Sequence, residues 1–185
     1  LKAKAVLCPG LTVKLKLEKT GEEIEWCYAE GLEQYLTEAI GETSHLPELP
    51  FSGSVTGEHE AVDWALVWMT GEGNNVSESY VNLVPTPQGG THVNGLRTGL
   101  ANAIREFCDF RNLLPRGLAL APEDVWDDVA FVLSVKLENP QFSGQTKESL
   151  SSRESAAYVT GIIKFVFQSS IKFCYFFIAT ICLFV

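Results

Sequence analysis

A polar loop near the end of the sequence carries the residue best suited to touch a phosphate group. The loop runs from residue 139 to 148 and contains Gln145, Thr146 and Lys147 in a row. A loop lysine presents a compact positive charge to a phosphate oxygen, and the amide and hydroxyl before it add neutral hydrogen-bond donors. The GxxxxGK[ST] spacing of a P-loop is absent. The residues alone therefore leave two interpretations of Lys147, a phosphate ligand or a solvated surface charge.

A second polar segment, residues 86–97, leads directly into the longest predicted helix. Its paired glycines permit backbone geometries that other residues resist, and Thr91 or Asn94 is expected to cap the helix. His92 lies in the same segment and has no Asp, Glu, Cys or His partner at an informative spacing. We therefore interpret His92 as a structural histidine, with a general base or a metal ligand as the alternative.

Three arginines, Arg97, Arg105 and Arg111, lie along the predicted helix and could face phosphates, but periodicity alone favours a polar helix face. The motifs HExxH, GxSxG and GxGxxG are absent, so we predict neither a catalytic residue nor a metal site. The five cysteines form no CxxC pair and no zinc spacing. That usage favours a reducing cytoplasm as the compartment.

Length and charge limit the class of protein. The 185 residues suffice for one folded domain, or for one domain with an appendage, and 46% of them are hydrophobic. The 14 Lys and Arg against 23 Asp and Glu give a net charge of −9. This balance excludes a broad basic surface for gripping nucleic acid, so any such contact must be local. Wholesale disorder and a disulfide miniprotein are excluded as well.

Hydrophobic periodicity predicts an α+β domain, a mixed sheet with helices packed on one face. A stripe of apolar residues from Leu96 to Phe110 is expected to pack the main helix on that sheet, and Ser151 or Ser152 to cap the last helix. Strands 62–68 and 77–84 are expected to pair as a hairpin through a turn at 71–75. The full expectation is a helix end at 1–8, strands at 11–17 with one buried face and at 24–28, a helix at 31–40, a loop at 41–53, the hairpin, the main helix at 95–112, a helical turn from 122, a strand at 129–137 and a helix at 153–167.

Several collinear runs of the sequence match one protein family. They are Leu1–Gly10, Ser79–Thr86, Gln88–Arg97, Arg111–Gly117, Gln141–Glu148 and Leu150–Arg153. On these runs, residues 1–164 resemble the gyrase B/topoisomerase IV B family of type II DNA topoisomerases. Gln88, the stretch Val93–Leu96 and the stretch Leu114–Gly117 resemble the topoisomerase IV branch more than gyrase B.

The resemblance implies a transducer domain with the α+β sandwich fold of ribosomal protein S5 domain 2. It would span residues 11–160, with residues 1–10 as the end of a linking helix from an ATPase domain that these residues lack. In the family, a Gln-Thr-Lys loop reaches the ATP site of its own chain. The resemblance therefore implies that Lys147 contacts the γ-phosphate of ATP, with Gln145 and Thr146 beside it.

The resemblance also implies partners. Arg97 matches an arginine that faces the hole through which the transported DNA duplex passes. The family role is to couple ATP binding and hydrolysis to DNA strand passage, in a homodimer of B subunits that works with the A subunit. The nucleotide-holding residues and the metal-binding acidic cluster of the family belong to the ATPase and Toprim domains, which would also hold Mg²⁺. Because these domains are missing, we expect the 185-residue fragment alone to be inactive.

The apolar tail at residues 161–185 departs from the family. We interpret it as an artefact of read-through into A+T-rich sequence, and together with a first residue that is not Met it suggests a fragment. The alternative is a truncated non-catalytic domain, with or without a membrane tether through the tail. The apolar run from Phe173 to Val185 is shorter than the roughly 20 residues that span a bilayer, so a membrane partner is not expected.

Overall fold

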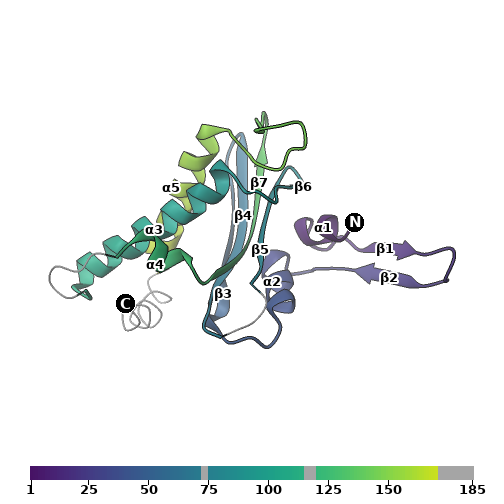
Figure 1. Ribbon diagram of the computed structural model, residues 1–185, viewed down its shortest axis with the longest axis horizontal. Coiled ribbons are helices and arrows are strands. Elements are labelled where there is room, and N and C mark those ends of the chain that lie inside the picture. Colours follow the sequence, from purple (N-terminus) through teal and green to yellow (C-terminus); the bar gives the residue numbers. More distant parts are fainter. Residues whose placement is uncertain (72–74, 115–119, 171–185) are drawn as a thin grey trace.

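The computed structural model describes residues 1–71, 75–114 and 120–170 (Figure 1). A five-stranded mixed sheet with the strand order β3-β4-β7-β5-β6 forms the centre, and β1 and β2 form a separate hairpin that projects away from it (Figure 1). The elements in chain order are α1 (Lys2–Leu7), β1 (Val13–Lys16), β2 (Glu23–Trp26), α2 (Leu32–Ile40), β3 (His45–Thr56), β4 (Glu60–Met69), β5 (Ser77–Val81), β6 (Val84–Pro85), α3 (Thr91–Arg111), α4 (Pro122–Trp126), β7 (Val129–Leu137) and α5 (Arg153–Ser169).

Strand β7 occupies the middle of the sheet. Its first seven residues are all buried, as expected for a continuous apolar run that is covered on both faces. It pairs antiparallel with β4, from Trp68 opposite Val129 to Glu60 opposite Leu137. On its other side it pairs parallel with β5. The strand predicted at 129–137 is therefore confirmed, and its two different neighbours make the sheet mixed.

The predicted hairpin of strands 62–68 and 77–84 is wrong. Strand β4 pairs with β3 and β7, and β5 pairs with β7 and β6, so β7 lies between the two expected partners. This position gives β7, whose first seven residues are buried, a neighbour on each edge. A hairpin of β4 with β5 would have left β7 at an edge of the sheet. The expected turn and the 114–117 run fall partly on residues 72–74 and 115–119, which lie outside the described residues.

The loop predicted at 41–53 is also wrong, because most of it belongs to strand β3. This strand forms an edge of the sheet and pairs only with β4 among the described residues. Its register shifts between Leu46 and Phe51, the stretch that contains Pro47 and Pro50. Proline cannot donate to a ladder, so it is tolerated at edge strands and bulges, the two features found here.

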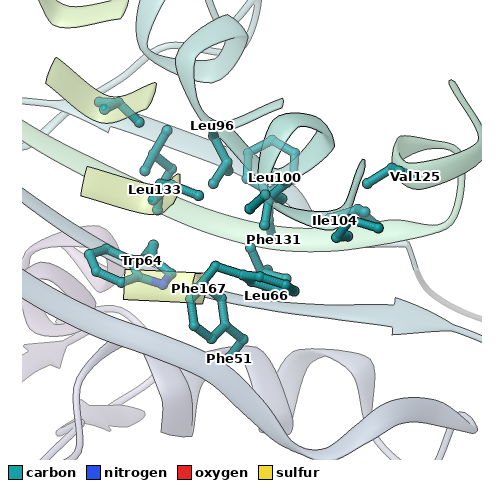
Figure 2. Packing of buried hydrophobic residues seen from close by; sticks show 14 of the residues in the cluster. Phe51, Trp64, Leu66, Leu96, Leu100, Ile104, Val125, Phe131, Leu133 and Phe167 are labelled. Carbon is teal, nitrogen blue, oxygen red and sulfur yellow. The ribbon is translucent and has the colours of Figure 1, made fainter. Parts of the chain in front are cut away.

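The long helices α3 and α5 cover one face of the sheet together with α4 (Figure 1). Leu96, Leu100 and Ile104 of α3 lie in the main core against residues of β4 and β7, among them Leu66 and Phe131 (Figure 2). The predicted stripe holds through Phe107, which is partly buried against this core, and is wrong at its last residue, because Phe110 is 80% exposed. Cys108, one turn after Ile104, is the buried residue there instead.

A smaller core lies on the opposite face, where α1 and α2 pack on Ala65, Val67, Ala130 and Val132. The helices expected at 1–8 and 31–40 are both present. The α+β class and the mixed sheet with helices packed on one face are confirmed, and α1 and α2 add a partial second layer. The strand expected at 11–17 is shorter, and its alternate residues Val13 and Leu15 are only half-buried.

Helix α5 extends through the first part of the predicted tail. Ile163 and Phe167 are buried in the main core, and the helix ends at Ser169. Residues 171–185 lie outside the described residues, and the interpretation of the tail as an artefact stays a prediction. Across the described ranges, no helix is both long and apolar enough to cross a membrane.

Candidate phosphate-contacting loop

The two polar segments singled out in the sequence lie side by side. The amide of Gln88 donates to the carbonyl of Glu148 at 3.0 Å. Farther along, the amide of Leu150 donates to Gly89 O at 3.0 Å, and its carbonyl accepts from the amide of Thr91 at 2.9 Å. The first segment and the end of the loop thus form a short parallel ladder, although about sixty residues separate them in the chain.

The loop also pairs with itself. Ser143 N donates to Ser149 O at 3.0 Å, and Ser151 N donates to Gln141 O at 2.8 Å, so its two arms run antiparallel. At the tip, the amide of Lys147 donates to Gly144 O at 3.3 Å and closes a four-residue turn. The second arm is therefore held on both sides, by the first arm and by residues 88–91.

The three residues expected to bind ATP all lie in this turn at the tip. Gln145, Thr146 and Lys147 are exposed. Within the described residues, no hydrogen bond or ion pair to another part of the chain involves the side chain of Gln145 or Lys147, and the Lys147 Nζ lies 5.9 Å from the centroid of the Phe142 ring. The turn presents one ammonium and one amide to whatever approaches the tip, an arrangement that suits a phosphate.

Lys147 has an unusual backbone conformation. Its φ of 58° lies in the left-handed region, which costs a residue with a Cβ about 1–2 kcal/mol. Such a conformation persists where the surrounding structure fixes it. Here the ladder begins at the very next residue, Glu148, so the lysine is held by its neighbours rather than by its own preference.

Two glycines make the close contact between the segments possible. Gly90 has a φ of 127°, and a Cβ built on it would lie 2.2 Å from the carbonyl oxygen of Leu150. Gly89 also has a positive φ, of 64°. Gly90 is the residue before the first turn of α3. The prediction that Thr91 or Asn94 caps the helix is wrong, because the helix begins at Thr91 and its N-cap residue is Gly90, which has no side chain to donate or accept a capping bond.

The other end of the loop meets α5 in a similar way. Ser152 is the N-cap residue of α5, as one of the two predicted candidates, but its side chain makes no capping hydrogen bond. Its hydroxyl instead accepts from the amide of Gln141 at 2.8 Å. Thr91 of α3 and Ser155 of α5 bond to each other through their hydroxyls at 2.9 Å. The loop base is thus tied to the first turns of both long helices.

His92 lies buried beneath this base. Its Nε2 is 3.2 Å from the hydroxyl of Thr86, which in turn bonds to the Ser79 carbonyl at 2.9 Å. Burial lowers the pKa of His92 to about 4, so the ring is neutral at pH 7. The partner is a threonine rather than an acidic or metal-binding residue, and this setting agrees with the interpretation of His92 as structural.

The three arginines lie along α3. Arg97 donates from Nη2 to Glu123 Oε1 of α4 at 2.8 Å, with 37% of its side chain exposed. Arg105 donates to the carbonyl of Leu120 at 3.4 Å. The ring of Phe107 lies 5.7 Å from the guanidinium carbon of Arg111. The predicted DNA-facing role of Arg97 is not tested by these contacts.

Sequence reasoning missed one contact at the site. The side-chain amide of Gln88 donates to Glu148 Oε2 at 2.8 Å, beside the backbone bond between the same residues. No local pattern signals this pair, since periodicity reports burial and both side chains lie at the surface. Among the described residues, no group of three or more His, Cys, Asp or Glu side chains could hold a metal ion.

The fold and the site agree with the family expected from the sequence. The fold is a mixed sheet with two long helices on one face, and the site is a lysine-tipped loop joined to the first turn of one of these helices. The sequence profile of the DNA gyrase B family matches residues 31–182, and the chain belongs to this family. Within it, the chain is similar to the B subunit of DNA topoisomerase 4 from Pseudomonas aeruginosa, with 63% identity over 168 residues. That match covers 91% of this chain and 27% of the relative.

Other relatives and solved structures agree. The B subunit of DNA topoisomerase 4 from Escherichia coli K12 is 59% identical over 167 residues, which is 90% of this chain and 26% of that protein. The topoisomerase IV ATP-binding domain of Francisella tularensis superposes with a TM-score of 0.84 and 32% identity over 98% of this chain and 49% of that one. The family predicted from the sequence is confirmed. The chain spans about a quarter of the length of its curated relatives.

The fold itself recurs at lower identity. The 43K ATPase domain of Thermus thermophilus gyrase B superposes with a TM-score of 0.80 at 22% identity, over 98% of this chain and 50% of that chain. At this identity the likeness concerns the architecture alone. It extends the α+β arrangement of sheet and helices to a gyrase B structure.

Proposed function

We propose that this chain is the transducer module of an ATP-dependent type II DNA topoisomerase, close to the topoisomerase IV B subunit. Residues 11–160 form the module, and residues 1–10 end a helix that joins it to an ATPase domain. The observation that carries the proposal is the tip of the loop, where Gln145, Thr146 and Lys147 stand exposed on a turn fixed by a ladder. Membership of the DNA gyrase B family supports it.

In this function the loop senses the terminal phosphate of ATP. The Lys147 ammonium offsets the charge that develops on the transferred phosphoryl group, and Gln145 and Thr146 donate neutral hydrogen bonds beside it. Once the γ-phosphate has left, that attraction is lost and the loop is released. ATP chemistry thereby becomes a change in the position of the whole module.

The base of the loop gives this signal a route into the module. The loop follows the central strand β7 and precedes α5, and its second arm bonds to the residues before α3. A pull on Lys147 therefore acts on the sheet and on both long helices at once. This connection supports a coupling role, in which nucleotide state and DNA passage are linked.

The remaining partners follow from the same proposal. The module works in the cytoplasm within a homodimer of B subunits, together with the A subunit, and Arg97 faces the transported DNA duplex. Mg²⁺ accompanies ATP and is held by the ATPase and Toprim domains rather than by these residues. The 185 residues by themselves neither hydrolyse ATP nor cleave DNA.

The test is Lys147→Ala in the complete B subunit. We expect ATP turnover to fall by about 100-fold or more, the usual loss when one donor to a developing charge is removed. Lys19→Ala is the matched control, because Lys19 also lies in an exposed turn, at the end of the β1–β2 hairpin. Unchanged turnover in Lys147→Ala would contradict the proposal.

A further inference from the structure

The contact between Gln88 and Glu148 is double, with one backbone bond at 3.0 Å and one side-chain bond at 2.8 Å. Glu148 directly follows Lys147 in the chain. We propose that Gln88 is a positioning residue that acts through Glu148 to set the place of Lys147 at the γ-phosphate. This inference rests on the proposed function, since it assumes that Lys147 meets a phosphate.

The first part of the argument concerns the backbone. On its N-terminal side, Lys147 is held by the bond across the turn to Gly144, the longest backbone bond in the loop at 3.3 Å. On its C-terminal side, the contact with Gln88 fixes the next residue, one Cα step of about 3.8 Å away. A shift of Glu148 therefore passes to Lys147 almost undiminished, and catalytic groups tolerate only small misplacements.

The second part concerns charge. Glu148 is the carboxylate next to Lys147 in the chain, and an ammonium paired with it would be less available to a phosphate. The Gln88 amide occupies Oε2 of that carboxylate with a neutral donor. Among the described residues, no ion pair joins Lys147 to Glu148. Gln88 thus bonds one oxygen of the carboxylate without adding a charge that would compete for the phosphate.

The experiment uses the complete B subunit and compares two nucleotides, ADP and the ATP analogue with an imido bridge between its last two phosphates. Only the analogue has a γ-phosphate, so the ratio of the two affinities isolates contacts to that group. Gln88→Glu places a second carboxylate beside that of Glu148, and the two repel each other. We therefore expect the preference for the analogue over ADP to fall about two- to five-fold, as for an exposed charge pair. Glu148→Gln leaves an amide donor facing an amide acceptor, and the ratio should stay within about two-fold of wild type.

The double variant with Gln88→Glu and Glu148→Gln is the decisive one. It exchanges the two groups, so the introduced amide donates to the introduced carboxylate and the contact is restored. We expect the affinity ratio to return to the wild-type value, an interaction between neighbours that a double-mutant cycle measures. The matched control is Gln34→Glu, because Gln34 donates to Glu38 at 2.9 Å in the same chemistry on α2. That change should leave the ratio as it is.

The outcomes separate this inference from the proposed function. If Lys147→Ala lowers the affinity ratio but Gln88→Glu does not, the positioning role is overturned and the phosphate contact stands. If Gln88→Glu lowers the ratio and the exchanged pair does not restore it, the side-chain pair is not the cause and the inference is again overturned. If Lys147→Ala leaves the ratio unchanged, both fail. A general loss of folding would instead lower the unfolding midpoint and weaken both nucleotides alike.

Discussion

Replacing Gly90 with alanine should separate the loop from the residues before α3. The new Cβ would lie 2.2 Å from Leu150 O and 2.5 Å from Leu150 N, both far below any normal contact. The backbone at Gly90, with φ at 127°, is itself strained for an alanine by about 1–3 kcal/mol. Moving the second arm of the loop away from Gly90 relieves the clash but breaks the hydrogen bonds of Leu150 with Gly89 and Thr91.

The size of the effect follows from these terms. Each backbone hydrogen bond contributes about 0.5–1.5 kcal/mol, so two of them with the strain give about 2–6 kcal/mol against the docked loop. Because each 1.4 kcal/mol is a factor of ten, even the low end corresponds to a change of about 30-fold in an equilibrium constant. Leu150 is itself buried, with 2% of its surface exposed, but neither Leu150 nor Gly90 belongs to the two hydrophobic clusters on the faces of the sheet, so we expect the loss to stay local.

Hydrogen exchange at single amides measures this directly. The amides of Leu150 and Thr91 donate the two bonds at risk, and we expect both to exchange at least about 30-fold faster in Gly90→Ala. Gly161→Ala is the matched control, as nothing lies within 4 Å of its Cβ position on the exposed side of α5. It should stabilise the protein by about 0.5–1 kcal/mol. Exchange within three-fold of wild type in Gly90→Ala would refute the reasoning.

Two further predictions concern His92 and Arg97. The pKa of His92 is depressed to about 4 in the folded state from 6.5 in the unfolded state, so its contribution to the free energy of unfolding is present above pH 6.5 and is lost as the pH falls to 4. In His92→Asn, the free energy of unfolding should fall less over this pH range, by up to about 3 kcal/mol. Denaturant titration at each pH measures the difference. An equal slope in the variant would contradict the burial argument. Arg97→Ala should cost less than about 1 kcal/mol of stability, since its ion pair with Glu123 is part-exposed, but should reduce the stimulation of ATP turnover by DNA while turnover without DNA stays. Unchanged stimulation would remove the DNA-facing role.

Much of the fold could be predicted where local pattern reports burial. The run from Val129 to Leu137 is apolar without interruption through its first five residues, and it lies at the centre of the sheet. The spacing of Leu96, Leu100 and Ile104 placed α3 on that sheet correctly. In both cases the signal is set by residues only one or four positions apart, so no knowledge of the rest of the chain is needed.

Pairing between distant segments could not be predicted in this way. The prolines at 47 and 50 indicated a loop, and only an edge position beside β4 makes a strand possible there. Ser77–Val81 gave no sign that its partner would be β7 rather than β4, because the partner begins about fifty residues later. The residue types at the tip of the loop left a phosphate ligand and a solvated charge as alternatives, and resemblance to a family chose between them, while the contact of Gln88 with Glu148 emerged only from the structure.

The central position of β7 has a consequence for how the domain forms. Strands β4 and β5 are made first, yet neither bonds to the other, and both acquire β7 as a neighbour only after more than forty further residues. Until then, a chain emerging from the ribosome carries two unpaired strand edges in the middle of its future sheet. Insertion of one strand closes both edges in a single late event of high contact order. The loop that carries Lys147 follows that strand, so it takes shape only once the sheet is complete.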